Sequence, residues 1–302
     1  MNTKEIILSY LSPGLAAQLA PIGTADFEKM TELRIRVDKP ILLYQKNHEQ
    51  SIGRFRPTPS DIAETIERIS QYSLYALEEE LRMGYITLPG GHRVGITGKV
   101  VAENRAVRTI RPINGLNIRV SRAIHGCADM VLPQLFETSS SGGKRLPYNT
   151  MIISPPGCGK TTMLRDIIRQ FSDGIPGLCP GITVGVVDER SEIGGSYRGV
   201  AQNDIGIRTD LLDSCPKDEG MVLLLRAMAP NVIAVDELGG ERDARAVEDV
   251  SNAGVRLLCT VHGRDLDDIK LKPALRGLLD KGIFKRFVVL RGPGQKAEVL
   301  SA

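Results

Sequence analysis

The stretch SPPGCGKTT, residues 154–162, has the residue types and the spacing that bind phosphate. It follows the pattern G-x-x-x-x-G-K-[ST] of a phosphate-binding loop except at the first position, where Ser154 replaces glycine. Such a loop points backbone N–H groups at phosphate oxygens, and Gly157 and Gly159 leave room for that approach. Position 154 contributes its backbone, so a serine with a negative φ fits the pattern. The sequence therefore predicts a working nucleotide site.

Two side chains of this loop carry the charge chemistry. Lys160 is expected to reach the β- and γ-phosphates of ATP, and the Thr161 hydroxyl is expected to bind Mg²⁺. The alternative is a glycine-rich turn with a chance lysine, but the loop follows an apolar run and opens a helical stretch, as the motif requires. The predicted nucleotide-binding residues are Pro156, Gly157, Cys158, Gly159, Lys160, Thr161 and Thr162.

A second acidic element, NVIAVDELGG, lies about 75 residues beyond the loop, in the same alternation of strands and helices. A strand that ends in two acids is a weak signal alone, because carboxylates often cap a following helix. Opposite a phosphate-binding loop, such a strand end predicts a ligand for a metal ion and a general base. Asp236 would hold Mg²⁺, through water, and Glu237 would polarise the attacking water as general base.

Two further apolar runs end in polar residues. VGVVDERSE places Asp188, Glu189 and Glu192 at one strand end, and LLCTVHGRD places Thr260 and His262 at another. Ligands of an open parallel sheet lie at the carboxyl ends of its strands, so Glu189 and Glu192 are also candidates for the general base. His262 could sense the γ-phosphate or polarise water. A lone histidine is more often structural, but its place at a strand end favours a functional role.

The elements that position these residues follow from hydrophobic patterning. The second half of the chain alternates uniformly apolar strands with helices, which indicates a largely parallel sheet covered on both faces. Its strands are expected at 151–154, 182–188, 231–237, 256–262 and 284–291, and its helices at 161–171, 219–229 and 241–254.

The first half predicts an antiparallel α+β unit. Strands are expected at 31–37, 41–45, 105–111 and 116–122, with a helical stretch at 59–84 capped by Ser60 and a hairpin at 85–98 turning at Gly90-Gly91. We expect an α/β protein with an N-terminal α+β domain at 1–127 and a RecA-like P-loop ATPase domain at 128–302, the segment 138–146 being a loop of the second domain.

In this order, these elements resemble the type II/IV secretion and pilus motor ATPases. VDERSE resembles the acidic "Asp box" of that family, with Arg190 in place of the usual proline. LLRAMAPNVIAVDELGGERD resembles its Walker B region, where the family usually has Gly-Glu and this chain has Asp236-Glu237. CTVHGRD resembles its "His box". The resemblance extends to the first half and implies that arginines of the N-terminal domain reach the nucleotide, with Arg93 and Arg119 as the candidates.

LPGGHRVGITG, LNIRVSR, SPPGCGKTTMLRD and VDERSEIGG together resemble a branch of that family from endospore formers. This resemblance covers nearly the whole chain. It implies an ATPase, expected as a ring and specifically as a hexamer of identical chains, that drives an assembly linking mother cell and forespore. The implied partners are membrane-bound sporulation channel proteins, and the implied cofactors are ATP and Mg²⁺.

Composition limits the alternatives. The net charge is only +3 and aromatic residues make up 4%, with no Trp, which disfavours stacking of single-stranded bases. No run approaches the roughly 18 apolar residues of a membrane span, and the cysteines number five, an odd count that favours reduced thiols. We therefore expect a cytoplasmic protein, or one lying peripherally at the inner face of the mother-cell membrane.

One segment keeps a second function open. Residues 82–125 hold eight Lys and Arg against the single acid Glu103, so their net charge is +7, more than that of the whole chain. Such a strip can be a solvated face, a source of nucleotide-binding arginines, or a contact for nucleic acid. The alternatives to the secretion-type motor are therefore a nucleic-acid-dependent AAA+/RecA-like motor or helicase loader, and a nucleotide-binding scaffold that hydrolyses little.

Overall fold

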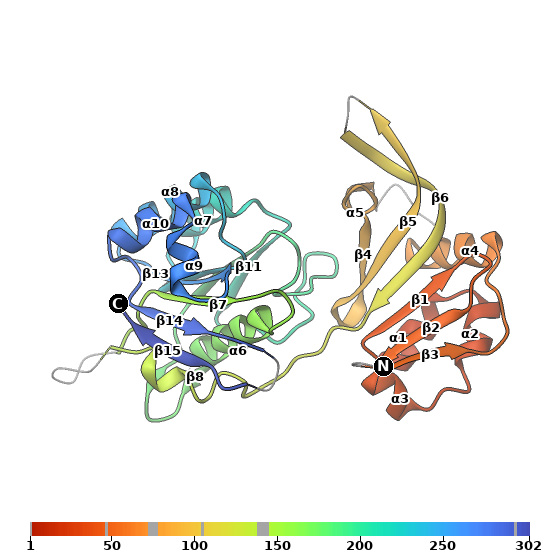
Figure 1. Cartoon of the computed structure of the whole chain (residues 1–302), viewed down its shortest axis with the longest axis horizontal. Helices are drawn as coiled ribbons and strands as arrows, with labels where there is room; N and C mark the ends of the chain where they lie inside the picture. The colour runs from red at the N-terminus through yellow and green to blue at the C-terminus, as the bar shows by residue number, and fades with distance from the viewer. Residues whose placement is uncertain (1, 46–47, 72–77, 104–105, 138–144, 293–294) are drawn as a thin grey trace. The chain divides into compact units, whose positions relative to one another are not determined.

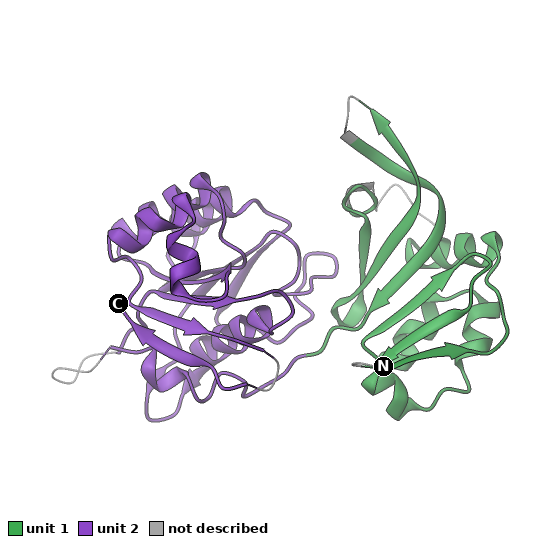
Figure 2. Ribbon diagram, in the orientation of Figure 1, with its two compact units in different colours: residues 1–122 green, residues 123–302 purple. Residues whose placement is uncertain are grey.

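The chain divides into two compact units, residues 1–122 and 123–302 (Figure 2). The structure is a computed structural model that describes all residues except 1, 46–47, 72–77, 104–105, 138–144 and 293–294. The expected domain boundary, 127/128, lies a few residues beyond the observed division. Cys127 and Ala128 pack in unit 2, where the Ala128 N–H donates to Asp166 at 2.9 Å.

Unit 1 is a six-stranded sheet with strand order β3-β2-β1-β6-β5-β4 (Figure 1). All of its neighbouring strands pair antiparallel, as the sequence predicts. The strands are β1 (Glu32–Arg36), β2 (Ile41–Gln45), β3 (His48–Ile52), β4 (Tyr85–Leu88), β5 (His92–Glu103) and β6 (Ala106–Arg119).

Helices cover one face of this sheet. They are α1 (Thr3–Tyr10), α2 (Pro13–Leu19), α3 (Thr24–Lys29), α4 (Pro59–Ile69) and α5 (Glu78–Met83), and a 3₁₀ turn, Pro89–Gly91, joins β4 to β5. Ile7, Leu15 and Ile66 of the helices pack with Leu33 and Val94 of the strands in one core. The alternate strand positions therefore lie on the opposite face of the sheet.

Three predictions for unit 1 need correction. The helical stretch expected at 59–84 is not one helix, because α4 ends at Ile69 with Ser70 as its C-cap and α5 spans Glu78–Met83. The two strands expected at 105–111 and 116–122 form one strand, β6, because Asn114-Gly115 does not turn: Gly115 pairs with Arg36 of β1 and with Thr97 of β5. The expected cap Ser60 lies inside α4, whose N-cap is Thr58. Pro59 explains the difference, because proline is favoured at the first helical position and the cap must precede it.

Replacing Thr58 with Ala is expected to destabilise unit 1 by about 1 kcal/mol. The Thr58 hydroxyl accepts from the Asp61 N–H at 3.2 Å, and Asp61 accepts from the Thr58 N–H at 2.9 Å, so the substitution removes a capping box. Urea unfolding followed by circular dichroism would measure the loss. Ser60→Ala is the matched control and should change the midpoint little; a larger effect at Ser60 than at Thr58 would contradict the assignment.

Unit 2 is a seven-stranded sheet with strand order β11-β10-β12-β13-β7-β14-β15 (Figure 1). Its strands are β7 (Thr150–Ser154), β10 (Val184–Asp188), β11 (Thr209–Asp213), β12 (Val232–Val235), β13 (Arg256–His262), β14 (Arg286–Val289) and β15 (Glu298–Ser301). Every pair is parallel except β14 with β15, which is antiparallel at the edge. A separate two-stranded sheet joins β8 (Gly174–Ile175) to β9 (Cys179–Pro180).

Both faces of the seven-stranded sheet are covered, as its uniformly apolar strands predict. On one face, Leu164 and Ile167 of α6 (Lys160–Asp173) pack on Ile152 and the neighbouring strands. On the other face, α7 (Lys217–Ala227), α8 (Glu241–Asn252), α9 (Leu266–Lys270) and α10 (Pro273–Asp280) pack on the alternate strand positions, including Met151 and Ile153. A short 3₁₀ turn, Leu132–Gln134, also joins the core of the α6 side.

Candidate active site

The phosphate-binding loop connects β7 to α6. Ser154 is the last residue of β7, so its backbone is extended, and its hydroxyl donates to the Pro155 carbonyl at 2.9 Å. Gly159 has a φ of +88° directly before Lys160 starts the helix, a conformation that favours glycine. The loop thus presents the N-terminus of a 14-residue helix, whose unpaired N–H groups and dipole attract anions.

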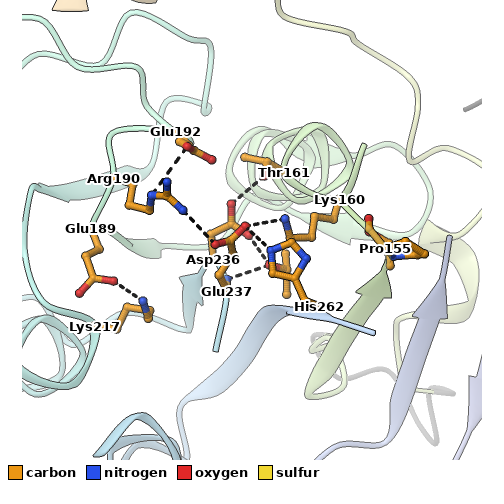
Figure 3. Close-up of polar contacts among 12 residues, drawn as sticks. Pro155, Lys160, Thr161, Glu189, Arg190, Glu192, Lys217, Asp236, Glu237 and His262 are labelled. Carbon is orange, nitrogen blue, oxygen red and sulfur yellow. Dashed lines mark hydrogen bonds and ion pairs between the residues drawn. The ribbon is translucent and has the colours of Figure 1, made fainter. Parts of the chain in front are cut away.

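The sheet topology brings the other predicted residues to this loop. Strand β13 lies between β7 and β12, and His262 is in register with Ser154. Asp236 and Glu237 follow the last residue of β12, at the same edge. Figure 3 shows Lys160, Thr161 and these acids converging there. The predicted convergence at the carboxyl ends of the strands is therefore present within unit 2.

Three polar side chains contact the Glu237 carboxylate. Oε1 lies 2.6 Å from Lys160 Nζ and 2.8 Å from His262 Nε2, and Oε2 lies 3.3 Å from an Arg190 guanidinium nitrogen. Burial acts to raise the pKa of this carboxyl, but the hydrogen bond and charge of Lys160, together with His262, outweigh burial and hold the pKa below its ordinary value. Glu237 is therefore ionised at neutral pH.

Asp236 is held by two hydroxyl groups. Thr161 Oγ1 donates to Oδ2 at 2.7 Å, and Thr260 Oγ1 donates to Oδ1. Burial raises the pKa of Asp236, while these hydrogen bonds and the charge of Lys160 act against the rise. A threonine hydroxyl and a carboxylate thus meet beside the start of α6, which is the oxygen donor set that Mg²⁺ prefers.

Thr260 organises the two acids. The sequence predicted that it lies at the same strand end as His262 but gave it no role. Its hydroxyl oxygen also accepts from the Glu237 N–H at 2.9 Å, so one side chain touches both Asp236 and Glu237. Glu237 has a φ of +58°, a left-handed conformation that costs a residue with a side chain about 1–3 kcal/mol. The period-2 spacing of Thr260 and His262 on one strand could have indicated that both face the same ligand.

The loop after β10 is anchored by the buried Asp188. Its carboxylate accepts from the backbone N–H groups of Glu192, Ile193 and Gly194 at 2.8, 2.9 and 2.8 Å. Burial, only partly offset by these hydrogen bonds, raises the pKa of Asp188 to about 6. Arg165 of α6 donates to the Ile193 carbonyl at 2.8 Å and to the Glu192 carbonyl at 2.7 Å. These contacts fix the backbone that carries residues 189–192 to the site.

The other candidate acids have cationic partners of their own. Glu189 pairs with Lys217 of α7, and Glu192 lies 3.9 Å from Arg190. Asp236, Glu237, Glu189 and Glu192 line one small cavity together with Asp188, Arg190 and Lys217. Glu237 is the acid that contacts the phosphate-loop lysine directly. Arg190 and Lys217 line the site but were not predicted from the sequence. The one signal for either residue was at position 190, where arginine replaces the usual proline.

The arginines that the resemblance assigns to the nucleotide lie in unit 1. Arg93 and Arg119 are register partners on β5 and β6, and the Arg93 guanidinium lies 3.8 Å from the centre of the Tyr85 ring. Elsewhere in the basic segment, Arg108 pairs with Glu103 at 3.0 Å and Arg122 donates to the Met30 carbonyl. Arg105 lies outside the described residues. The assignment of Arg93 and Arg119 to the nucleotide remains a prediction.

The residues present fit a magnesium–nucleotide complex. No group of three or more His, Cys, Asp or Glu in the described part of the chain could hold a metal ion by itself. Magnesium sites in nucleotide-binding proteins do not need one, because the ion takes one or two protein oxygens, substrate phosphates and water. Thr161 and Asp236 would supply the protein oxygens, and Lys160 and the N-terminus of α6 would face the phosphates.

Comparison with known proteins decides the family. Residues 1–301 match the family model described as sporulation stage III, protein AA. The chain belongs to this family. Stage III sporulation protein AA of Bacillus subtilis (strain 168) is 38% identical to this chain over 296 residues, which cover 97% of this chain and 94% of that protein. The resemblance found in the sequence is therefore confirmed.

Solved structures place this chain in a known fold. The pilus retraction motor PilT with bound ADP matches with a TM-score of 0.60 and 15% identity, covering 92% of this chain and 81% of PilT. The Legionella pneumophila ATPase DotB matches with a TM-score of 0.57 and 13% identity, covering 91% of this chain and 75% of DotB. The predicted RecA-like P-loop fold is confirmed.

Within the described residues, no helix is long and apolar enough to span a membrane.

Proposed function

We propose that this chain is a Mg²⁺-dependent ATPase that forms a ring of identical subunits and drives a sporulation-associated export or channel assembly between mother cell and forespore. The observation that carries the ATPase assignment is the meeting of Lys160, Thr161, Asp236 and Glu237 at one edge of the sheet, through contacts of 2.6 Å between Lys160 and Glu237 and 2.7 Å between Thr161 and Asp236. The biological task is supported by the family membership.

The proposed chemistry divides among these residues. Lys160 and the N-terminus of α6 bind the phosphates and orient the γ-phosphate. Magnesium, when bound at Thr161 and Asp236, supplies positive charge against the phosphate oxygens. Glu237 takes a proton from the attacking water as its oxygen bonds to the γ-phosphorus and the bond to the β-phosphate oxygen breaks, giving ADP and phosphate. When Lys160 pairs with phosphate, Glu237 loses a cation, its pKa rises, and it becomes a stronger base.

The partners in this proposal are a second copy of the chain and membrane-bound sporulation channel proteins. We place the protein in the cytoplasm or peripherally at the inner face of the mother-cell membrane, as a hexamer whose N-terminal arginines, Arg93 and Arg119, contribute to the nucleotide. Mixing Arg93→Ala with Lys160→Ala protein tests this last point. Activity should return if Arg93 acts across a subunit boundary, and mixing should restore nothing if it acts within one subunit.

The basic segment favours a second candidate, a nucleic-acid-dependent motor, because its +7 charge is more than the whole chain carries. ATP hydrolysis measured against protein concentration, with and without DNA, separates the candidates. The ring proposal expects a steep rise of specific activity with concentration and no response to DNA. Stimulation by DNA with salt-sensitive binding would support the nucleic-acid motor instead. Tight ATP binding without turnover would support a scaffold.

A further inference from the structure

Both oxygens of the ionised Glu237 carboxylate contact other side chains. Lys160 and His262 lie at Oε1, and Arg190 lies 3.3 Å from Oε2 (Figure 3). A general base must accept a proton from water on one of its oxygens, and a carboxylate held by cations on both sides is poorly placed to do so. Departure of either cation would raise the pKa of Glu237 and make it a stronger base.

Lys160 has an evident destination, because it belongs to the phosphate-binding loop, and Arg190 contacts the same carboxylate from the other side. A terminal phosphate placed against Lys160 would bring new negative charge close to the Arg190 guanidinium, which lies 3.3 Å from Glu237 and 3.9 Å from Glu192. Guanidinium can pair with phosphate through two parallel hydrogen bonds, so the γ-phosphate is a strong competing partner for Arg190.

The construction of the loop suits such an exchange. Its backbone is anchored, because Asp188 accepts three backbone N–H groups and Arg165 donates to two carbonyls of the same loop. The Arg190 side chain itself is 63% exposed, so solvent surrounds much of it and a change of rotamer displaces no core residue. Because the backbone is anchored and the side chain is long and exposed, the guanidinium can move between two nearby anions without refolding of the loop.

We propose that Arg190 senses the terminal phosphate of ATP from within the subunit that binds it, holding Glu237 before ATP arrives and releasing it when the guanidinium pairs with the γ-phosphate. This inference rests on the proposed ATPase function and adds a nucleotide-contacting residue to it. ADP has no γ-phosphate, so it should leave Arg190 on Glu237.

The test compares the affinities of the full-length chain for ATP and ADP, by calorimetry with Mg²⁺ and in the Glu237→Gln background so that ATP persists. Arg190→Ala should weaken ATP binding about 10-fold, since a charge-assisted hydrogen bond is lost, and leave ADP binding unchanged. Arg190→Lys, which keeps the charge without the planar fork, should recover part of the loss. Arg276→Ala is the matched control, an arginine 68% exposed and paired with Asp280 on α10, and it should change neither affinity.

The outcomes separate cleanly. An unchanged ratio of ATP to ADP affinity in Arg190→Ala would overturn the sensing role. Equal losses for both nucleotides would also overturn it, because they would show that Arg190 only shapes the loop. If the parent chain binds neither nucleotide, the proposed function itself is wrong and this inference fails with it.

Discussion

Replacing Glu237 with Gln is expected to reduce ATP turnover by about 10²–10⁴-fold while leaving ATP binding largely intact. Gln has the same size as Glu, so the backbone contact between the Glu237 N–H and Thr260 at 2.9 Å is kept. The amide cannot accept a proton from water, and it no longer attracts Lys160, which remains available for phosphate. Single-turnover phosphate release, measured beside equilibrium ATP binding, separates the two effects.

The other acids of the same cavity provide the controls for this prediction. Glu189 is already paired with Lys217, and Glu192 contributes backbone groups that Asp188 and Arg165 hold. Glu189→Gln and Glu192→Gln should therefore retain much more activity than Glu237→Gln. If Glu237→Gln hydrolyses ATP at the wild-type rate and one of the other variants does not, the base is that other acid.

Lys160→Ala is expected to weaken ATP binding at least about 30-fold and to abolish measurable hydrolysis. Lys160 is buried and pairs with Glu237, so its removal takes away the charge meant for the β- and γ-phosphates and also leaves the carboxylate at that position with less compensation. Truncating one partner of a buried charge pair costs about 2 kcal/mol or more, which corresponds to that change in affinity. Calorimetric titration of ATP with Mg²⁺ present measures it.

Lys217→Ala is the matched control, because Lys217 lines the cavity that Glu237 lines and, like Lys160, pairs with an acid, in this case Glu189. It lies on α7 rather than on the phosphate loop, so its loss should leave ATP affinity within a few-fold of wild type. The assignment of the loop would be wrong if Lys160→Ala bound ATP as tightly as the wild-type chain, or if Lys217→Ala lost binding to the same extent.

Strong hydrophobic periodicity made unit 2 predictable. Strand β13 spans the residues expected from RLLCTVH, and α6 extends the helix expected after the phosphate loop by one or two residues at each end. Strand β11 was missed because its two leucines lie between Asp210 and Asp213, so its pattern does not resemble a core strand. Its pairing with β10, which supplies backbone partners along its whole length, makes it a strand despite its composition.

The site was predictable where a residue type has one chemistry and unpredictable where geometry decides. Lys160, Thr161 and Asp236 stood out because loop and strand end constrain them. Thr260 was predicted at a strand end but without a role, because that role depends on the side-by-side placement of β12 and β13, which brings its hydroxyl to Asp236 and to the Glu237 N–H. The contact of Arg190 with Glu237 likewise depends on how the loop after β10 folds back, and Asp188 determines that through hydrogen bonds between neighbours in sequence.

The measurement that tests the central claim most directly is phosphate release from ATP by the purified full-length chain, with Mg²⁺ and with a chelator in its place. The account predicts release that requires Mg²⁺, that disappears in Lys160→Ala, and that is reduced by the expected factor in Glu237→Gln. Absence of release at every protein concentration, or release of the same size in Lys160→Ala, would contradict the claim that these residues form an ATPase site.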